Sequence, residues 1–227
     1  MTNTPTFIYY TALGQYESLS RYLNQADQKK QLTFTNPIRR QTFIAGRALL
    51  AIALKCHYGS NRYQIAYTEA GKPYLHFPKG YYFNLTHSSN HLYLALQQTQ
   101  PIGIDCEVIR QKNYQRVAKR LFSHEEYHKI ANNKDPLAAF FLRWTQYEAA
   151  VKYAGKSIFS KPGWENNQEN NQANNTIIYS FRHQQQILSI CTAADTAMSL
   201  QCYQWCADSQ QIKRFKLHFL SKLTSPG

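Results

Sequence analysis

The chain has 227 residues, enough to bury a sizeable core as one large domain or two small ones. Its 26 Lys and Arg against 13 Asp and Glu give a formal charge of +13, which indicates a polyanionic partner: nucleic acid, an acidic membrane surface, a phosphorylated ligand or an acidic protein. No apolar window of about 18 residues predicts a membrane span, the N-terminal segment lacks the pattern of a secretory signal, and five scattered cysteines favour reduced thiols in the cytoplasm over disulfides or a zinc site.

The first part of the chain predicts several strands around one long helix. A strand at residues 6–11 and a short helix at 17–24 come first. Asn36 and Pro37 then open an amphipathic helix that runs to about residue 57. Further strands are predicted at 63–68, 81–87 and 91–98, with a turn at 69–73.

The second part repeats this mixture of strands and helices. A strand at 102–108 precedes helical patterns at 114–121, 123–131 and 135–156, and strands are then predicted at 176–183, 186–192, 198–205 and 212–220. The Asn/Gln-rich stretch from Glu165 to Asn175 predicts a mobile loop without chemistry. The order indicates an α+β fold, with a boundary near residues 99–101 that separates residues 1–101 from 102–227.

The helix at 135–156 carries the first candidate site residues. Asp135 suits its N-cap and Gly155 its C-terminal left-handed position. Glu148 falls in the middle of the apolar stripe and Lys152 lies one turn later at its edge. A carboxylate in a core is costly unless it is paired or binds a metal, so Glu148 is either half of a buried ion pair or a metal ligand.

The strand at 102–108 adds two carboxylates. Asp105 and Glu107 share one face, whereas Ile104 and Cys106 point to the other. Alone, the two acids are consistent with a surface edge strand. Together with Glu148 they form an oxygen-rich set of the kind that binds Mg²⁺ beside a phosphate ligand.

Other residues of this part of the sequence are suited to bind phosphate. His87 and Ser88 end a strand at a sharp turn, where they can donate to a phosphate or cap their own hairpin. Lys152 can reach a phosphate or pair with Glu148 one turn away. Ser123 and Glu126 form a capping box, which gives Glu126 a structural role. Arginines of the helix at 37–57 can face a phosphate or solvent; they are Arg39, Arg40 and Arg47.

Five motifs in the right order resemble the 4′-phosphopantetheinyl transferases, in the larger surfactin-synthetase-activating type. They are GKP (71–73), NLTHS (84–88), GIDCE (103–107), FSHEEY (122–127) and WTQYEAAVK (144–152). Each motif is weak alone, and the combination is specific. The resemblance implies a monomer of two similar α+β halves (a pseudo-dimeric fold), with coenzyme A and Mg²⁺, or Mn²⁺, in the cleft between them.

The resemblance also implies roles by matching position. Asp105, Glu107 and Glu148 would hold the metal. The coenzyme A contacts would be Lys152, His87 and Ser88 at the phosphates, Lys72 and Pro73 on the adenine side, and one or more of Arg39, Arg40 and Arg47 at the 3′-phosphate. Residues 1–101 would supply the adenine and phosphate contacts, and residues 102–227 the metal ligands and the catalytic helix. The family usually has Lys before the helix glutamate, where this chain has Tyr147, a departure that concerns a phosphate contact more than catalysis and whose effect the sequence leaves open.

The implied reaction moves phosphopantetheine from coenzyme A to a serine of an apo carrier protein and releases 3′,5′-ADP. Lys152 would stabilise charge on the leaving group, with Glu148 as first and Glu107 as second choice of general base. An acidic carrier would match the charge of +13. Two alternatives remain open: a basic nucleic-acid-binding protein or Mg²⁺-dependent nuclease, which leaves GKP and NLTHS unexplained, and a catalytically silent carrier-binding module.

Overall fold

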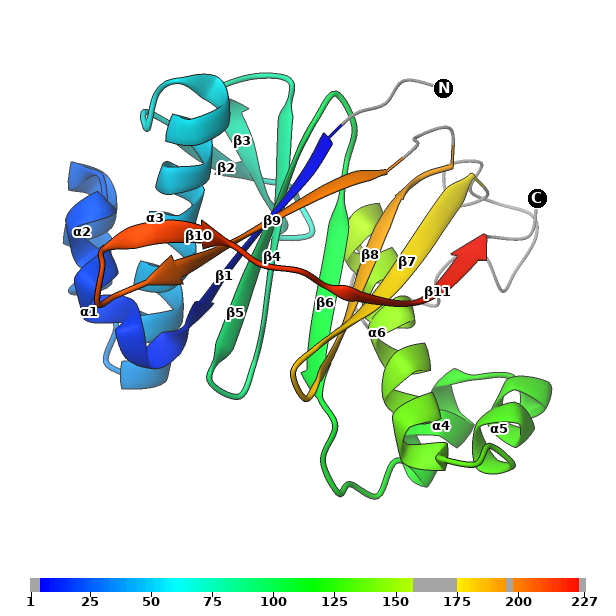
Figure 1. Ribbon diagram of the computed structural model, residues 1–227. Coiled ribbons are helices and arrows are strands. Elements are labelled where there is room, and N and C mark those ends of the chain that lie inside the picture. The colour runs from blue at the N-terminus through cyan, green and yellow to red at the C-terminus, as the bar shows by residue number, and fades with distance from the viewer. Residues whose placement is uncertain (1–4, 157–174, 195–197, 225–227) are drawn as a thin grey trace.

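Two β-sheets, each covered by one long helix, form the framework of the molecule (Figure 1). The computed structural model describes residues 5–156, 175–194 and 198–224. Residues 165–174 of the predicted loop at 165–175 therefore lie outside the described residues. The mixture of sheets and helices confirms the α+β class.

The first sheet has the order β10 (Gln211–Arg214), β9 (Ser199–Cys206), β1 (Pro5–Ala12), β5 (His91–Gln98), β4 (Tyr81–Ser88). The second has the order β11 (His218–Thr224), β7 (Thr176–His183), β8 (Gln186–Ala193), β6 (Gly103–Val108). A separate hairpin pairs β2 (Gln64–Tyr67) with β3 (Pro73–Phe77).

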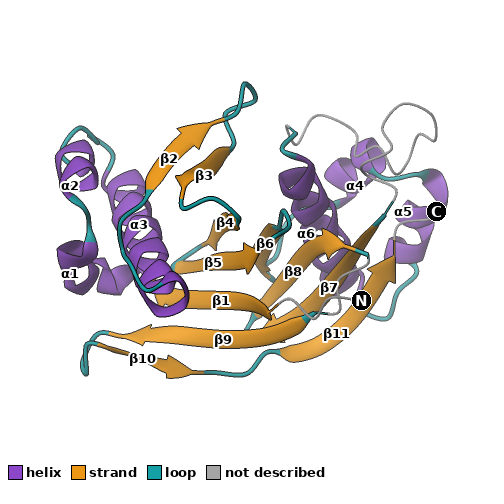
Figure 2. Cartoon of the chain, turned by 90° about the horizontal axis from the view of Figure 1, so that it is seen from above, coloured by secondary structure: helices purple, strands orange, loops and turns teal. Residues whose placement is uncertain are grey.

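Alternation along β1 explains how the layers stack. Phe7 and Tyr9 face α3 (Pro37–Tyr58), whereas Ile8 and Tyr10 enter a second core that the two sheets share. On the outer side of the second sheet, α6 (Pro136–Ala154) packs against β6 and β8. The order helix, sheet, sheet, helix buries both faces of the central strands, whereas the edge strands β10 and β11 are largely exposed (Figure 2).

The shorter helices lie at the two ends of this layered structure, beside α3 and beside α6. Near α3 lie α1 (Tyr16–Leu19) and α2 (Gln25–Gln31), with 3₁₀ turns at Leu13–Gln15 and Ser20–Tyr22. Near the start of α6 lie α4 (Gln115–Leu121) and α5 (His124–Ala131) (Figure 1). No helix in the described ranges is long and apolar enough to cross a membrane.

Three sequence expectations need correction. The single helix at 17–24 is wrong, because turns break it and Asn24 caps α2, a helix that was not predicted. The strand β3 was also missed. The single strand at 212–220 is wrong because the chain leaves the first sheet after β10 and enters the second at β11; Phe215, between them, packs on Tyr10 and His183. Because β9 pairs parallel with β1, residues from the C-terminal part of the chain complete the first sheet.

Candidate active site

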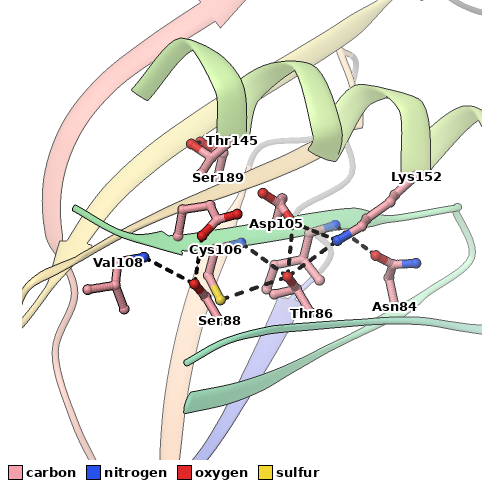
Figure 3. A network of polar contacts seen from close by, with 11 residues as sticks. Asn84, Thr86, Ser88, Asp105, Cys106, Val108, Thr145, Lys152 and Ser189 are labelled. Carbon is pink, nitrogen blue, oxygen red and sulfur yellow. Dashed lines mark hydrogen bonds and ion pairs between the residues drawn. The ribbon is translucent and has the colours of Figure 1, made fainter. Parts of the chain in front are cut away.

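Side chains of β4 join the two sheets where their edge strands meet. Asn84 Oδ1 accepts from the backbone N–H of Ile104 (3.0 Å) on β6. Two residues on, Thr86 Oγ1 accepts from Cys106 N–H (3.2 Å), and Ser88 Oγ accepts from Val108 N–H (3.2 Å). These three bonds form a ladder made by side chains in place of backbone carbonyls, and it fixes the register of NLTHS against GIDCEV (Figure 3).

The two hydroxyls of this ladder also hold the predicted carboxylates. Thr86 donates to Asp105 Oδ1 (2.9 Å), and Ser88 donates to Glu107 Oε2 (2.7 Å). Asp105 and Glu107 share one face of β6, as predicted, while Ile104 and Cys106 lie in the core between the sheets. Asp105 is only 5% exposed, so the alternative of two surface acids does not hold for it.

A glycine lets α6 approach this face of β6. A Cβ at Gly103 would lie 2.1 Å from the Ala149 carbonyl oxygen, so only glycine fits there without moving the backbone. The close approach brings Lys152 onto Asp105: Lys152 Nζ donates to Asp105 Oδ1 at 2.6 Å and to Thr86 Oγ1 at 3.3 Å (Figure 3). Glu148, one turn earlier, is 9% exposed and also lies on the buried side of α6.

Burial and mutual repulsion set the charges of these acids. Burial raises the pKa of Glu148 to about 7, and the charges of Asp105 and Glu107 add to this effect while Lys152 opposes it. Burial likewise raises the pKa of Asp105 against the attraction of Lys152. Burial lowers the pKa of Lys152, but Asp105 and Glu148 outweigh it and leave that pKa raised. Glu148 therefore titrates near neutral pH beside a lysine that stays charged.

The carboxylate oxygens of Asp105, Glu107 and Glu148 are the type of ligand that a hard divalent cation prefers. The three carboxylates are, however, not arranged around a common point. The Oδ2 atom of Asp105 is buried without a hydrogen-bond partner, which is costly for a carboxylate. In the described ranges no group of three or more His, Cys, Asp or Glu forms a metal-binding arrangement. Lys152 supplies the positive charge at Asp105 and partly offsets the repulsion at Glu148, while Asp105 Oδ2 is left without a hydrogen-bond partner.

A hollow of about 320 Å³ contains several of the predicted coenzyme A residues. It is lined by the predicted Arg39, Arg47, Pro73 and His87, together with apolar side chains of α3 and β4. Burial lowers the pKa of His87, as does the charge of Lys152, and Asp105 and Glu107 oppose the shift. The ring is therefore neutral at pH 7. Because His87 lies between Thr86 and Ser88, whose hydroxyls donate to Asp105 and Glu107, the hollow adjoins the acidic cluster.

The other predicted coenzyme A residues have protein partners. Lys72 Nζ donates to the carbonyl oxygens of Lys152 (2.5 Å) and Tyr153 (3.0 Å), and burial lowers its pKa to about 8. It thereby ties the turn between β2 and β3 to the C-terminus of α6. Arg47 is buried on Asp27 (3.6 Å) and Tyr67 (3.2 Å), and Arg40 Nε donates to Gln31 (3.0 Å). Arg39 is exposed.

Two further expectations concern α5 and α6. The capping box of Ser123 and Glu126 is confirmed, and Glu126 also pairs with Arg143 of α6. Tyr147 is 1% exposed and packs against Phe122 and Trp144. Tyr147 is therefore a core residue of α6.

Sequence reasoning missed the side-chain ladder. The sequence places Asn84 and Thr86 only within the NLTHS motif and suggests a phosphate as the partner of Ser88. The period-two spacing of three short polar residues in an otherwise apolar strand is the signal that indicates such a ladder, because all three must point to one side.

Comparison with known proteins identifies the family. Residues 101–213 match the model of the 4′-phosphopantetheinyl transferase superfamily. The transferase AcpT of Salmonella typhimurium is 33% identical over 155 residues, which cover 67% of this chain and 77% of that protein. AcpT of Escherichia coli K12 is 30% identical over 171 residues (74% and 83%), and HetI of Nostoc sp. is 33% identical over 153 residues (64% and 65%).

The matched region contains β6 and α6, which carry the three acids and Lys152. The alignment with AcpT extends the likeness over two thirds of the chain and more than three quarters of that relative. The chain therefore belongs to the 4′-phosphopantetheinyl transferase superfamily and is an enzyme of that class.

Proposed function

We propose that this enzyme transfers the 4′-phosphopantetheine group of coenzyme A to a serine hydroxyl of an apo carrier protein and releases 3′,5′-ADP, in a Mg²⁺-dependent reaction. The observation that carries this proposal is the uncompensated buried oxygen of Asp105 beside Glu107, Glu148 and Lys152. It lies next to a hollow lined by Arg39 and His87. No observation on the described residues favours the nuclease alternative over phosphopantetheine transfer.

Lys152 and Glu148 have the properties that the reaction needs. Lys152 stays protonated and is held by Asp105, so its charge can stabilise the phosphate that leaves with the nucleotide. Glu148, whose pKa burial raises to about 7 in the metal-free protein, is the first choice to take the proton of the attacking serine. Glu107 is the second choice, because Ser88 already donates to one of its oxygens.

Asp105, Glu107 and Glu148 would hold Mg²⁺, with Mn²⁺ as a substitute. A hard divalent ion supplies Lewis-acid stabilisation of charge on phosphate oxygens. In its absence the acids repel one another, and this repulsion adds to burial, the larger cause, in raising the pKa of Glu148.

The class of substrate can be tested by intact-mass spectrometry. Apo carriers of fatty-acid, polyketide and peptide-synthetase type are incubated with the enzyme, coenzyme A and Mg²⁺, and with EDTA in parallel. We expect at least one carrier to gain the mass of one phosphopantetheine group only with free Mg²⁺. Equal transfer with EDTA would contradict the metal dependence, and no transfer to any carrier would contradict the substrate class.

Two neighbouring arginines allow a matched test of 3′-phosphate binding. Arg39 lines the hollow, whereas Arg40 is exposed and bonded to Gln31. We expect Arg39→Gln to weaken coenzyme A binding about tenfold, the effect of one lost charge-assisted contact. Its affinity for 3′-dephospho-coenzyme A should be unchanged, and Arg40→Gln should bind both like wild type. Titration calorimetry measures these affinities. Equal affinities of wild type for coenzyme A and its 3′-dephospho form would contradict the assignment of Arg39 to the 3′-phosphate.

The charge of +13 should steer an acidic carrier to the enzyme. Salt screens such attraction over roughly 10 Å at 0.1 M. The apparent KM for the carrier should therefore rise when the ionic strength is raised about tenfold, from about 20 to about 200 mM NaCl. Coenzyme A binding should change less. A KM that does not change would show that the charge serves another partner, such as nucleic acid.

The finer assignments are part of the same proposal. We place the enzyme in the larger, surfactin-synthetase-activating type, as a cytoplasmic monomer with two similar halves at residues 1–101 and 102–227. The covered sheets with their helices α3 and α6 support the division into halves, although β9 and β10 cross to the first sheet.

A further inference from the structure

Two histidines on α5 face each other away from the candidate active site. His124 and His128 are one turn apart, both are exposed, and their Nε2 atoms lie 3.0 Å apart. The ring centroids are 4.3 Å apart with an interplanar angle of 63°. Neither residue is used by the proposed reaction.

The pair borders an open hollow of about 470 Å³, which is also lined by Lys119, Phe122 and Tyr127. With metal–nitrogen bonds of about 2.0–2.1 Å, two nitrogens 3.0 Å apart subtend about 94° at a metal ion. That angle matches neighbouring positions of a square-planar or octahedral ion better than the tetrahedral angle of zinc. We propose that His124 and His128 form a binding site for a late first-row divalent metal ion, of which Cu²⁺ and Ni²⁺ fit best.

The neighbouring charges leave both imidazoles available. Glu125 is paired with Lys129 (2.7 Å) on the exposed side of α5, and Lys119 lies over the Tyr127 ring (5.2 Å). No third His, Cys, Asp or Glu completes a metal cluster within the described ranges, so water or another molecule takes the remaining positions. Each imidazole binds as the neutral tautomer with its proton on Nδ1, so the hydrogen bond between the two Nε2 atoms is replaced by two metal bonds.

The ion would clamp α5 across one turn. The capping box fixes the start of that helix, and Glu126 ties it to Arg143 of α6. Lys152 lies near the other end of α6. Metal binding is therefore expected to raise the melting temperature without changing the rate of transfer.

The test uses the full chain without a polyhistidine tag. Calorimetric titrations with Cu²⁺ and Ni²⁺ compare wild type with His124→Gln, His128→Gln and the double variant, and Lys129→Gln is the matched control on the same helix. We expect wild type and Lys129→Gln to show one site that the double histidine variant lacks. Each single histidine variant should bind about tenfold or more weakly, because it loses one of the two nitrogen ligands.

Electron paramagnetic resonance of the Cu²⁺ complex gives a second readout. Coupling to two nitrogens is expected in wild type, and to fewer in either single variant. Wild-type affinity and an unchanged spectrum in the double variant would overturn the proposal, since the ion would then bind elsewhere. Absence of binding to correctly folded wild type, checked by its transfer activity, would overturn it too.

Discussion

Glu148→Gln is expected to reduce phosphopantetheine transfer by orders of magnitude while leaving the metal-free protein as stable as wild type, or more stable, at pH 8. The loss of transfer follows from removing the proposed base and a proposed metal ligand. The gain in stability follows from the raised pKa: burial and the charges of Asp105 and Glu107 disfavour the ionised form of Glu148 in the folded state.

The pH dependence has a defined sign. The pKa of Glu148 rises from 4.5 to about 7 on folding, so the folded state binds more protons between these values. Stability from this group therefore falls as pH rises through that window, at most about 1.4 kcal/mol per pH unit and roughly 3 kcal/mol in all. Above pH 7 wild type loses this full amount of folding stability, because Glu148 is ionised, whereas Glu148→Gln has no ionisable group there and loses none. The stability difference should vanish near pH 4.5.

Thermal and urea melts at pH 5 and pH 8, without metal or coenzyme A, measure this difference. Glu125→Gln is the control, because that acid is exposed and pairs only with Lys129 on the surface. Adding Mg²⁺ and coenzyme A should stabilise wild type but not Glu148→Gln. A variant that melts below wild type at pH 8 would show instead that Glu148 holds a buried cation in place.

Local patterns in the sequence were enough to predict most elements of the site. The caps of α6 at Asp135 and Gly155, the alternation along β6 and the capping box of α5 are all as expected, because each depends on neighbours within one or two turns. The burial of Glu148 also follows from its place on the apolar stripe. These features require no knowledge of how the sheets pack.

The contacts between distant segments were not predictable in the same way. That Lys152 pairs with Asp105, rather than with Glu148 one turn away, depends on how closely α6 approaches Gly103. Lys72 reaches the end of α6 only because the turn between β2 and β3 lies beside it. The division of residues 211–224 between two sheets likewise depends on strand pairing, since the hydrophobic pattern continues through the crossing.

The pairing of Lys152 with Asp105 leads to a result opposite to that for Glu148. Asp105→Asn should destabilise the metal-free protein, because it leaves the Lys152 ammonium without its buried partner. The loss should stay below the ~3–5 kcal/mol of a broken buried pair, since the change also removes the cost of burying the Asp105 carboxylate, which raises its pKa, and water can compensate the 27% exposed Lys152 side chain in part. Transfer should also fall sharply, because both residues belong to the proposed site.

A double-mutant cycle separates the ion pair from other effects of these changes. Lys152→Met removes the cation and leaves Asp105 buried without it, so the double variant Asp105→Asn/Lys152→Met should lose much less stability than the two single losses added together. The exposed pair Glu125 and Lys129 is the matched control, with nearly the same separation (2.7 against 2.6 Å) but side chains 78% and 72% exposed. Its cycle should show almost no coupling, because water screens the pair. Urea unfolding at pH 7 without Mg²⁺ measures both cycles. Equal coupling in the two pairs would mean that Asp105 does not hold Lys152, and the lysine would then lack the fixed position that the proposed transfer requires.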